Sequence, residues 1–340
     1  MNYMGIDHHK QYSQMTLMDE KGKELKNERV WNFRSEVEKF LQGAGDEVKA
    51  VIEAGRSSYT MVDLLEELGV DVKIANPKEV KAIAKAKIKT DKRDSRILAH
   101  LLRANLIPEV YQRSGENRRR QRVLRQRAFF VGTMTRVKNK IRALLAQQKE
   151  EIQIEISRVK NLFSRKGLEA LNGLDLPDTD SELVDGLLKM YQQLKERIKE
   201  SDELVESLYN KMPEAQLIST VPGFGKFFSV LVSTEIADVG RFSRVEKLHS
   251  YAGVIPSTYS SGERHYHGHI IKEGNKWLRW AAVEAVWPAI KSDFDLRVFF
   301  DKQAKRKNIN AAKVATARRL LTIIYRILKE RRNYVPYKRS

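Results

Sequence analysis

The chain has 340 residues, of which 41% are hydrophobic and 31% charged, and this balance is typical of a folded protein with two or three domains. The formal net charge of +19 favours binding to a polyanion, and nucleic acid is the expected partner. The absence of cysteine excludes disulfides, thiolate catalysis and cysteine-ligated zinc. No signal peptide, lipidation motif or apolar run of ~20 residues is evident, so we expect a cytoplasmic protein with no membrane partner.

The first 112 residues alternate between strand and helix patterns and are predicted to form an α/β domain. Strands are expected at 2–7, 14–18, 29–33, 48–53 and 70–75. Helices are expected at 35–41, 59–68 and from Asn76 onward, with Ser35 as the cap of the first and Pro77 in the first turn of the last. Three meandering strands followed by βαβα units are the order of the ribonuclease H-like fold.

Four acidic residues of this region stand where a metal-dependent nuclease needs carboxylates. Asp7 and Glu53 end two predicted strands, and Asp91 and Asp94 begin a helical pattern, on one face of it because they are three residues apart. Strand ends and a helix start can converge at one edge of an α/β sheet. Converging carboxylates need a cation, and Mg²⁺ fits such oxygen ligands. The alternative is that these are ordinary surface acids.

Residues 113–210 lose all strand signals and are predicted to form an antiparallel coiled-coil hairpin. Apolar residues recur at three- and four-residue spacing in two long helices, and Leu171 to Asp180, with a glycine and a proline, is predicted to be the break between them. The first helix is rich in arginine. Its basic face could be solvated or could bind nucleic acid, and the hairpin could equally be a dimerisation arm.

Residues 211–330 read as a mostly helical domain, followed by a basic tail at 331–340. The segment from Ser219 to Gly225 is similar to a helix-hairpin-helix turn that binds phosphate, although Pro-Gly-x-Gly is also a plain turn. His265, His267 and His269 would share one face of a strand, but we favour contacts with nucleic acid over a metal site because no fourth ligand is evident. The basic helix 311–328 could bind nucleic acid or pack against the domain.

Taken together, these motifs resemble the DEDD transposases of bacterial insertion sequences, the insertion-sequence-110 family of bridge-RNA-guided recombinases. The resemblance runs over nearly the whole chain. Its blocks are Gly5-Ile6-Asp7 with Lys10, Glu53-Ala54-Gly55, Asn76-Pro77 with Val80-Lys81, Lys89-Thr90-Asp91 with Asp94 and Leu98-Ala99, Pro222-Gly223-Phe224-Gly225, Phe242-Ser243, Tyr251-Ala252-Gly253 with Pro256, Ser261-Gly262, Gly268, Lys272, Gly274-Asn275 and Leu278-Arg279.

The resemblance implies a RuvC-like N-terminal domain, a coiled-coil insertion and a C-terminal transposase domain. It implies that Asp7, Glu53, Asp91 and Asp94 bind Mg²⁺, with Mn²⁺ possible, and that Ser261 attacks a DNA phosphate and forms a covalent phosphoserine intermediate. The implied partners are donor and target DNA, a guide RNA and further copies of the chain in a dimer or tetramer. The candidates for nucleic-acid contacts are Arg118, Arg119, Arg120, Arg122, Lys226, Arg264, Lys272, Lys276 and Arg279.

The chain departs from the family pattern at a few positions. His8-His9 replaces the small and hydroxyl residues usual after the first Asp, Gly55-Arg56 stands where a Thr-Gly pair is common, and Ser95 stands where alanine is typical. Ser260 beside Ser261 leaves the nucleophile ambiguous by one residue. Two other functions fit the residues: a Holliday-junction-type nuclease that uses the same acids with water as nucleophile, and a nucleic-acid-binding protein without catalysis.

Overall fold

The computed structural model describes residues 1–45, 47–84, 90–261, 264–270 and 273–336, with the backbone alone between 256 and 270. The chain separates into two compact units, Met1–Arg113 and Ser114–Ser340, and each is described by itself. Three positions from the sequence motifs, Lys89, Gly262 and Lys272, lie outside the described residues.

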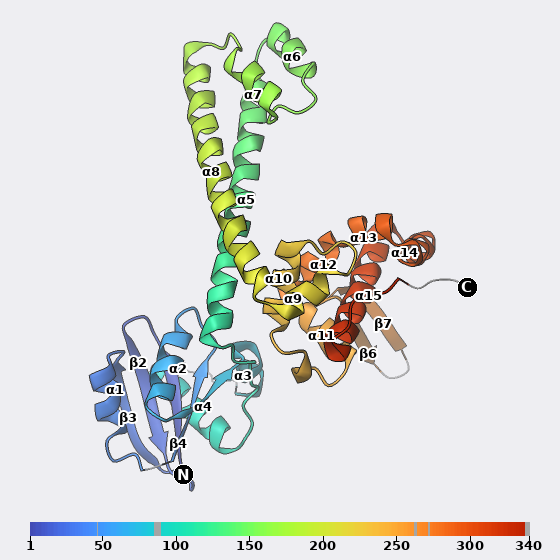
Figure 1. Cartoon of the computed structure of the whole chain (residues 1–340). Helices are drawn as coiled ribbons and strands as arrows, with labels where there is room; N and C mark the ends of the chain where they lie inside the picture. The colour runs from blue at the N-terminus through green and yellow to red at the C-terminus, as the bar shows by residue number, and fades with distance from the viewer. Residues whose placement is uncertain (46, 85–89, 262–263, 271–272, 337–340) are drawn as a thin grey trace. The chain divides into compact units, whose positions relative to one another are not determined.

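The first unit is built on a five-stranded sheet in the order β3-β2-β1-β4-β5 (Figure 1). The strands are β1 (Asn2–His8), β2 (Tyr12–Met18), β3 (Glu24–Trp31), β4 (Val48–Glu53) and β5 (Asp71–Ala75). Strands β1, β2 and β3 form an antiparallel meander, whereas β4 runs parallel to both β1 and β5. Because β1 and β4 are parallel neighbours, their C-terminal ends meet at the same edge of the sheet.

Strand alternation gives the sheet two apolar faces, and helices cover both. On one face, Met4, Ile6 and Ile52 pack with α1 (Arg34–Leu41) and α2 (Ser58–Glu67). On the other face, Val51 and Ala75 pack with Val80 of α3 (Pro77–Ile83) and with Leu98, Leu101 and Leu102 of α4 (Asp91–Arg103). The unit therefore has three layers, with the sheet in the middle.

Most predicted elements of the first unit are present, with two corrections. The third strand begins at Glu24, five residues before the predicted start. Its first six residues are exposed or half-buried at the edge of the sheet, so they show no apolar alternation that would mark a strand. Ser35 does not cap α1; Phe33 is the N-cap residue and makes no side-chain cap hydrogen bond. The predicted start of α3 is confirmed, with Pro77 in its first turn and the Asn76 side chain accepting from the backbone N–H of Lys78.

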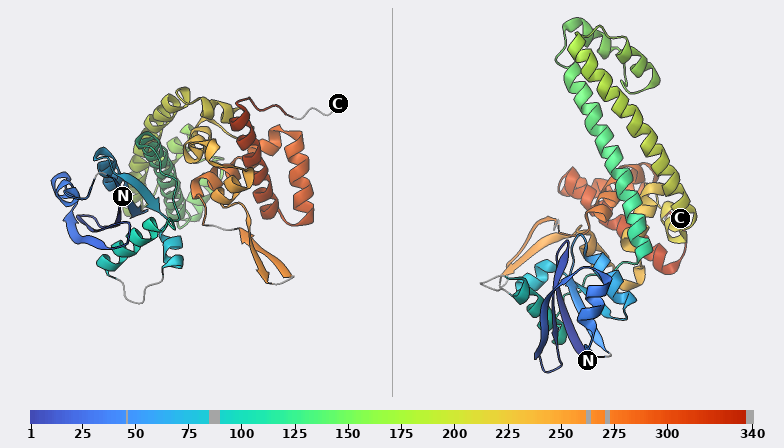
Figure 2. Two further views of the ribbon diagram at one scale, coloured as in Figure 1. Left: turned by 90° about the horizontal axis from the view of Figure 1, so that it is seen from below. Right: turned by 90° about the vertical axis from the view of Figure 1, so that its left-hand side faces the viewer.

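The second unit begins with a hairpin of two long helices, α5 (Gly115–Leu145) and α8 (Asp178–Asn210), which lie side by side in every view (Figures 1 and 2). Val137 and Ile141 of α5 pack against Val184, Leu188 and Tyr191 of α8. The predicted break at Leu171 to Asp180 is wrong. The connection runs from Ala146 to Pro177 and contains two short helices, α6 (Glu150–Ser157) and α7 (Arg165–Asn172), whose apolar residues cover the end of the hairpin.

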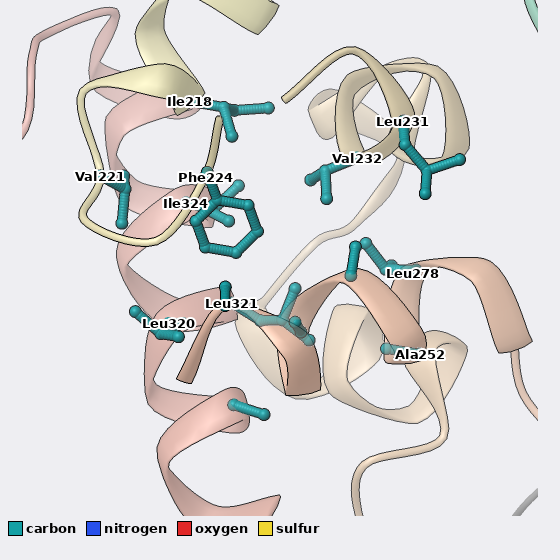
Figure 3. Close-up of a cluster of buried hydrophobic side chains, with 14 of the residues drawn as sticks. Ile218, Val221, Phe224, Leu231, Val232, Ala252, Leu278, Leu320, Leu321 and Ile324 are labelled. Carbon is teal, nitrogen blue, oxygen red and sulfur yellow. The ribbon is translucent and has the colours of Figure 1, made fainter. Parts of the chain in front are cut away.

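The remainder of the second unit is a helical core with one β-hairpin. Its elements are α9 (Pro213–Ser219), α10 (Lys226–Ile236), η1 (Val239–Arg241), α11 (Val245–Ala252), β6 (Pro256–Ser261), β7 (Arg264–Ile270), α12 (Lys276–Glu284), α13 (Val286–Ser292), α14 (Phe294–Arg306) and α15 (Ile309–Glu330). Figure 3 shows side chains from α9, α10, α11, α12 and α15 directed at one another. Helix α15 thus packs into the domain through Leu320, Leu321 and Ile324, which confirms the packing role expected for the basic helix 311–328. Nucleic-acid binding by its remaining face stays a prediction.

The glycine-rich turn between α9 and α10 has a packing role. Gly223 has φ +92°, and a Cβ on it would lie 2.3 Å from the carbonyl oxygen of Ala285. Only glycine allows this left-handed turn to touch the backbone that links α12 to α13. The chain after α15 is also held in place, because the Tyr334 hydroxyl donates to Asp293 Oδ2 at 2.6 Å.

Across the described part of the chain, we find no helix with the combined length and hydropathy of a transmembrane segment.

Candidate functional site

The close approach of α4 to β1 builds the acidic site. A Cβ on Gly5 would lie 2.0 Å from the Ser95 carbonyl oxygen and 2.4 Å from the Ala99 nitrogen, so glycine is the residue that lets α4 lie directly on the strand. The buried Ser95 hydroxyl bonds Thr16 of β2 at 2.8 Å and secures the same contact. Because side chains alternate along a strand, Asp7 lies on the face that Gly5 opens to α4.

The start of α4 supplies the second carboxylate. Thr90 caps this helix by accepting from the backbone N–H of Arg93, and Asp91 and Asp94 fall in the first turn. Two acids at a helix N-terminus are stabilised by the helix dipole and by the unpaired N–H groups there. The sequence pattern of a capping threonine followed by two acids therefore predicts both the helix start and the placement of negative charge.

His9, which the sequence did not indicate as a site residue, contacts both Asp7 and Asp91. Nε2 of His9 lies 3.1 Å from Oδ2 of Asp91 and 3.4 Å from Oδ2 of Asp7. The three residues each offer a ligand atom, and these atoms lie within 4.8 Å of one another. The Tyr12 hydroxyl donates to Asp91 at 3.3 Å. All of these side chains are half-buried at the rim of the sheet, so a phosphate group could reach them.

Tyr12 is in turn fixed by an aromatic and cationic stack. Its ring lies 4.7 Å from the His9 ring, and the Arg29 guanidinium carbon lies 3.6 Å from the Tyr12 ring centroid. A guanidinium over a ring face is an attractive arrangement that places positive charge beside the acids. Arg29 is exposed, so its charge also faces any polyanion that approaches this edge.

Glu53 and Asp94 share the region with Asp7 and Asp91 but are not part of the close cluster found among the described residues. Glu53 ends β4, the parallel neighbour of β1, and alternation puts it on the same face as Val51, which packs against α4. Asp94 follows Asp91 by one helical turn. Both side chains are half-buried. The structure thus joins two of the four predicted acids with His9, while Glu53 ends the neighbouring strand and Asp94 lies in the first turn of α4.

The preceding histidine has a different environment. His8 faces the opposite side of β1, where Nδ1 lies 2.9 Å from the Ser13 hydroxyl. Burial lowers the pKa of His8, and the positive charge of His9 acts in the same direction, whereas a backbone hydrogen bond with Ser57 opposes it. The His8-His9 pair therefore divides into an imidazole on the opposite face of β1, whose pKa is lowered, and one that contacts the acids.

The donor set fits a divalent cation. Two carboxylates beside an imidazole suit Mn²⁺ well, while Mg²⁺ prefers oxygen ligands alone and keeps several waters. Asp7, Asp91 and His9 would hold such an ion. The like charges of the acids would then be neutralised by the cation.

The predicted nucleophile lies in the second unit. Ser261 is the last residue of β6, and its backbone pairs in register with Arg264, the first residue of β7. Ser260 pairs with His265, so the two candidate serines lie at consecutive positions of the hairpin. His265, His267 and His269 do fall on one strand, as the alternation required.

The basic candidates differ in their surroundings. Arg119 and Arg122 are exposed on α5, whereas Arg120 is half-buried and pairs with Glu116. Lys226 pairs with Glu206 at the start of α10, and Lys276 is exposed at the start of α12. Arg279 donates to the carbonyl oxygen of Ala252 at 3.2 Å and so has a structural bond within the core.

A buried glutamate organises the motif residues of the second unit. Glu235 is 1% exposed and accepts from Asn275 Nδ2 at 2.7 Å, Gln121 Nε2 at 3.1 Å and Arg125 Nη2 at 3.3 Å. Asn275 also caps α12 by accepting from the backbone N–H groups of Trp277 and Leu278. A buried carboxylate needs such partners. The network ties α5, α10 and α12 together. The role of Glu235 could not be predicted from the sequence, in which it is one acid within a mostly apolar helical segment.

Comparison with known proteins agrees with this organisation. A DEDD IS110-type family model described as "Transposase" matches residues 4–149, and one described as "Transposase IS116/IS110/IS902 family" matches residues 215–300. The transposase for insertion sequence element IS1111A of Coxiella burnetii is 24% identical over 97% of this chain and 90% of that protein. The insertion element IS116 uncharacterized 44.8 kDa protein of Streptomyces clavuligerus is 22% identical over 98% of this chain and 96% of its own length.

The first model spans the α/β unit with its acidic edge and continues through α5, and the second matches part of the helical core. The chain belongs to the IS110 family of insertion-sequence transposases.

Proposed function

We propose that this transposase cuts and rejoins the DNA of an insertion sequence, with Asp7, Glu53, Asp91 and Asp94 as a metal-binding site and Ser261 as the nucleophile. The observation that carries the proposal is the meeting of Asp7 and Asp91, 84 positions apart in the chain, on the face of β1 that Gly5 opens to α4. The strand order and the position of the acids at the ends of β1 and β4 support a RuvC-like assignment for the first unit.

A cation held by the acids, Mg²⁺ or Mn²⁺, would neutralise charge on the phosphoryl oxygens of the scissile phosphate and polarise the phosphorus. Asp7, Asp91 and His9 would hold the ion at the rigid edge of the sheet. The Tyr12 hydroxyl orients Asp91, and Arg29 adds positive charge beside the acids. Rigid placement of this kind lets the site stabilise the transition state without reorganising.

Ser261 supplies the covalent step. Its hydroxyl oxygen attacks phosphorus, the bond between phosphorus and one deoxyribose oxygen breaks, and that oxygen leaves as a hydroxyl with the proton from serine. The number of phosphodiester bonds is unchanged, so a second strand's hydroxyl can reverse the step on the same phosphorus and release serine. Rejoining therefore needs no ATP. An activated serine requires a nearby metal or base.

The nucleic-acid partners follow from the same proposal. Donor and target DNA are the substrates, and a structured guide RNA pairs with both, which leaves the protein to bind backbone and shape. The net charge of +19 and the exposed arginines of α5 support polyanion binding. Strand exchange requires several strands to be held together, which favours a homo-oligomer acting at the nucleoid in the cytoplasm.

The test uses purified full-length protein, Mg²⁺, the RNA flanking the element and end-labelled donor DNA, resolved under denaturing conditions. We expect a protein-linked label that disappears in Ser261→Ala and in Asp7→Asn. Ser260→Ala is the matched control for the nucleophile. Asp71→Asn is the control for the acid, because Asp71 is exposed at the opposite end of β5; both controls should retain the adduct.

The outcomes separate the proposal from its rivals. Cleaved DNA without an adduct, unaffected by Ser261→Ala but lost in Asp7→Asn, would show hydrolysis by a Holliday-junction-type nuclease with water as nucleophile. Binding without cleavage under every metal and RNA condition would support a non-catalytic nucleic-acid-binding protein. Cleavage that does not change when the RNA is omitted would remove the guide from the proposal and leave the two catalytic sites.

A further inference from the structure

Helices α10 and α12 bring four aromatic rings together at the surface of the second unit. Trp280 is the centre of this group: its ring lies 5.1 Å from Phe228, 5.9 Å from Trp277 and 6.1 Å from Phe227, each in an edge-on arrangement. Trp280 is nevertheless 36% exposed. Edge-on packing of its neighbours holds the indole in one orientation and leaves part of it open to a ligand.

Helix α5 adds a further aromatic side chain beside this group. Phe129 is 57% exposed, and it lines a hollow of about 560 Å³ together with Arg125, Ala128, Lys276, Trp277 and Trp280. A second hollow of about 640 Å³ lies next to it and shares Trp280 and Ala128, with Phe227 and Phe228 on its wall. We call the surface formed by Phe129, Trp277 and Trp280 the aromatic shelf.

Positive charge borders the shelf. The Lys276 ammonium lies 5.6 Å from the Trp277 ring centroid, and the Arg125 guanidinium carbon lies 5.7 Å from the same ring. Arg125 is partly exposed, and its bond to the buried Glu235 fixes its position. The second hollow is bordered by Arg127 and Lys226, each paired with an acid of α8. Two cations, of which Arg125 is fixed by its ion pair, thus lie beside Trp277 at the border of the exposed rings of Trp280 and Phe129.

We propose that the aromatic shelf binds unpaired nucleotides, with bases stacked on Trp280 and Phe129 and phosphates held by Lys276 and Arg125. Exposed rings bordered by cations are the two parts of a site for single-stranded nucleic acid, because every base has a π-face and every linkage a charge. Bases inside a duplex are already stacked and cannot use the rings. A chain with net charge +19 favours this polyanion over an apolar protein segment.

This site goes beyond the proposed reaction, since none of its residues belongs to the acidic cluster or to the β6–β7 hairpin. It would hold a single-stranded part of the substrate DNA or of a structured RNA. The two sources share the same chemistry, so the experiment compares them directly.

The experiment measures fluorescence anisotropy of labelled oligonucleotides of about 12 nucleotides, oligo-dT and oligo-U, and of a duplex of equal length, with the full-length protein at fixed salt. Stacking contributes ~1–3 kcal/mol per base. Trp280→Ala and Phe129→Ala should therefore each weaken single-strand binding about 5- to 150-fold, while duplex binding stays unchanged. Trp280→Phe should retain most of the affinity. Trp287→Ala is the control, because Trp287 is 42% exposed but packs on Phe300, away from the shelf.

Several results decide the matter. Unchanged single-strand affinity in Phe129→Ala, whose side chain is too exposed for folding to suffer, would overturn the proposal. Equal losses for duplex and single strand would also overturn it and show a general basic surface. Altered sedimentation with unchanged oligonucleotide affinity would assign the shelf to self-association instead. Tighter binding of oligo-U identifies RNA as the ligand, and tighter binding of oligo-dT identifies DNA.

Discussion

Replacing Gly5 with alanine tests whether the approach of α4 to β1 builds the metal site. The added Cβ would lie 2.0 Å from the Ser95 carbonyl oxygen and 2.4 Å from the Ala99 nitrogen, whereas real Cβ contacts essentially never fall under 3.0 Å. Both opposing atoms belong to the backbone of α4, so no side-chain rotation relieves the clash. The helix must retreat by about 1 Å or more, which is typical of overpacked cores.

Two consequences follow. Overpacking of this kind costs about 1–3 kcal/mol of folding free energy. The chemistry is affected as well, because Asp91 moves with α4 while Asp7 and His9 stay with the sheet. A misplacement of ~1 Å can reduce a rate about 100-fold. We therefore expect Gly5→Ala to remain folded with a lowered melting temperature and to lose most metal affinity and DNA cleavage.

The measurements are thermal unfolding by circular dichroism, calorimetric titration with Mn²⁺, and cleavage of donor DNA. Gly132→Ala serves as the control, because no atom lies within 4 Å of a Cβ at that helical position. The reasoning would be refuted by a Gly5→Ala protein with normal metal affinity and cleavage. A protein that loses stability but binds Mn²⁺ normally would show that α4 can shift without disturbing the acids.

Three further changes probe other contacts. His9→Ala should raise the Mn²⁺ concentration for half-maximal cleavage about tenfold or more, with Lys10→Ala as control; an unchanged titration would remove His9 from the site. Asn275→Ala should destabilise the protein by about 2–3 kcal/mol in denaturant unfolding, since it removes a helix cap and a donor to buried Glu235. Asn308→Ala, which removes a cap alone, should cost about 1 kcal/mol, and equal losses in the two variants would contradict a role for Glu235. Burial lowers the pKa of His249 below 6.5, and the charge of Arg318 acts in the same direction, whereas Glu246 opposes it. As the pH falls, the unfolded chain therefore binds the proton before the folded protein does, so stability should fall as the pH drops through 6.5. His249→Gln should flatten that fall, by at most about 1.4 kcal/mol per pH unit, in melting temperatures measured from pH 7 to 5; identical slopes for the two proteins would contradict it.

The strands and the positions of the acids were predictable because both depend on local patterns. Alternation locates β1 and β4 and their ends, and Thr90 followed by Asp91 and Asp94 marks the start of α4. The convergence of Asp7 and Asp91 then follows from the general geometry of α/β sheets. The roles of these acids in catalysis stay predictions, as does the role of Ser261.

The features that escaped prediction depend on tertiary contacts. His9 reaches Asp91 because the chain turns back after β1, where the His9 N–H bonds the Tyr12 carbonyl oxygen at 2.9 Å. The helices α6 and α7 carry too few apolar residues to show a clear period, and they gain stability from the end of the hairpin that they cover. Glu235 sits within a helix whose other buried residues are mainly apolar, so only its partners on α5 and α12 reveal why a charge is tolerated there.

Helix α5 is one continuous element of 31 residues, about 46 Å long, with different partners along its length. Leu124, near its start, belongs to the helical core together with Val205 of α8, while Val137 and Ile141 belong to the hairpin. The hairpin is therefore not a removable insertion, because excising it would remove Leu124 and Val205 from the hydrophobic core of the domain that carries Ser261. The hairpin can be shortened only by deleting matched whole turns from both α5 and α8. A transposase with a shorter hairpin could be engineered by deleting one heptad from α5 on the C-terminal side of Val131 and one heptad from the facing part of α8. The part of the hairpin that packs in the helical core would stay intact.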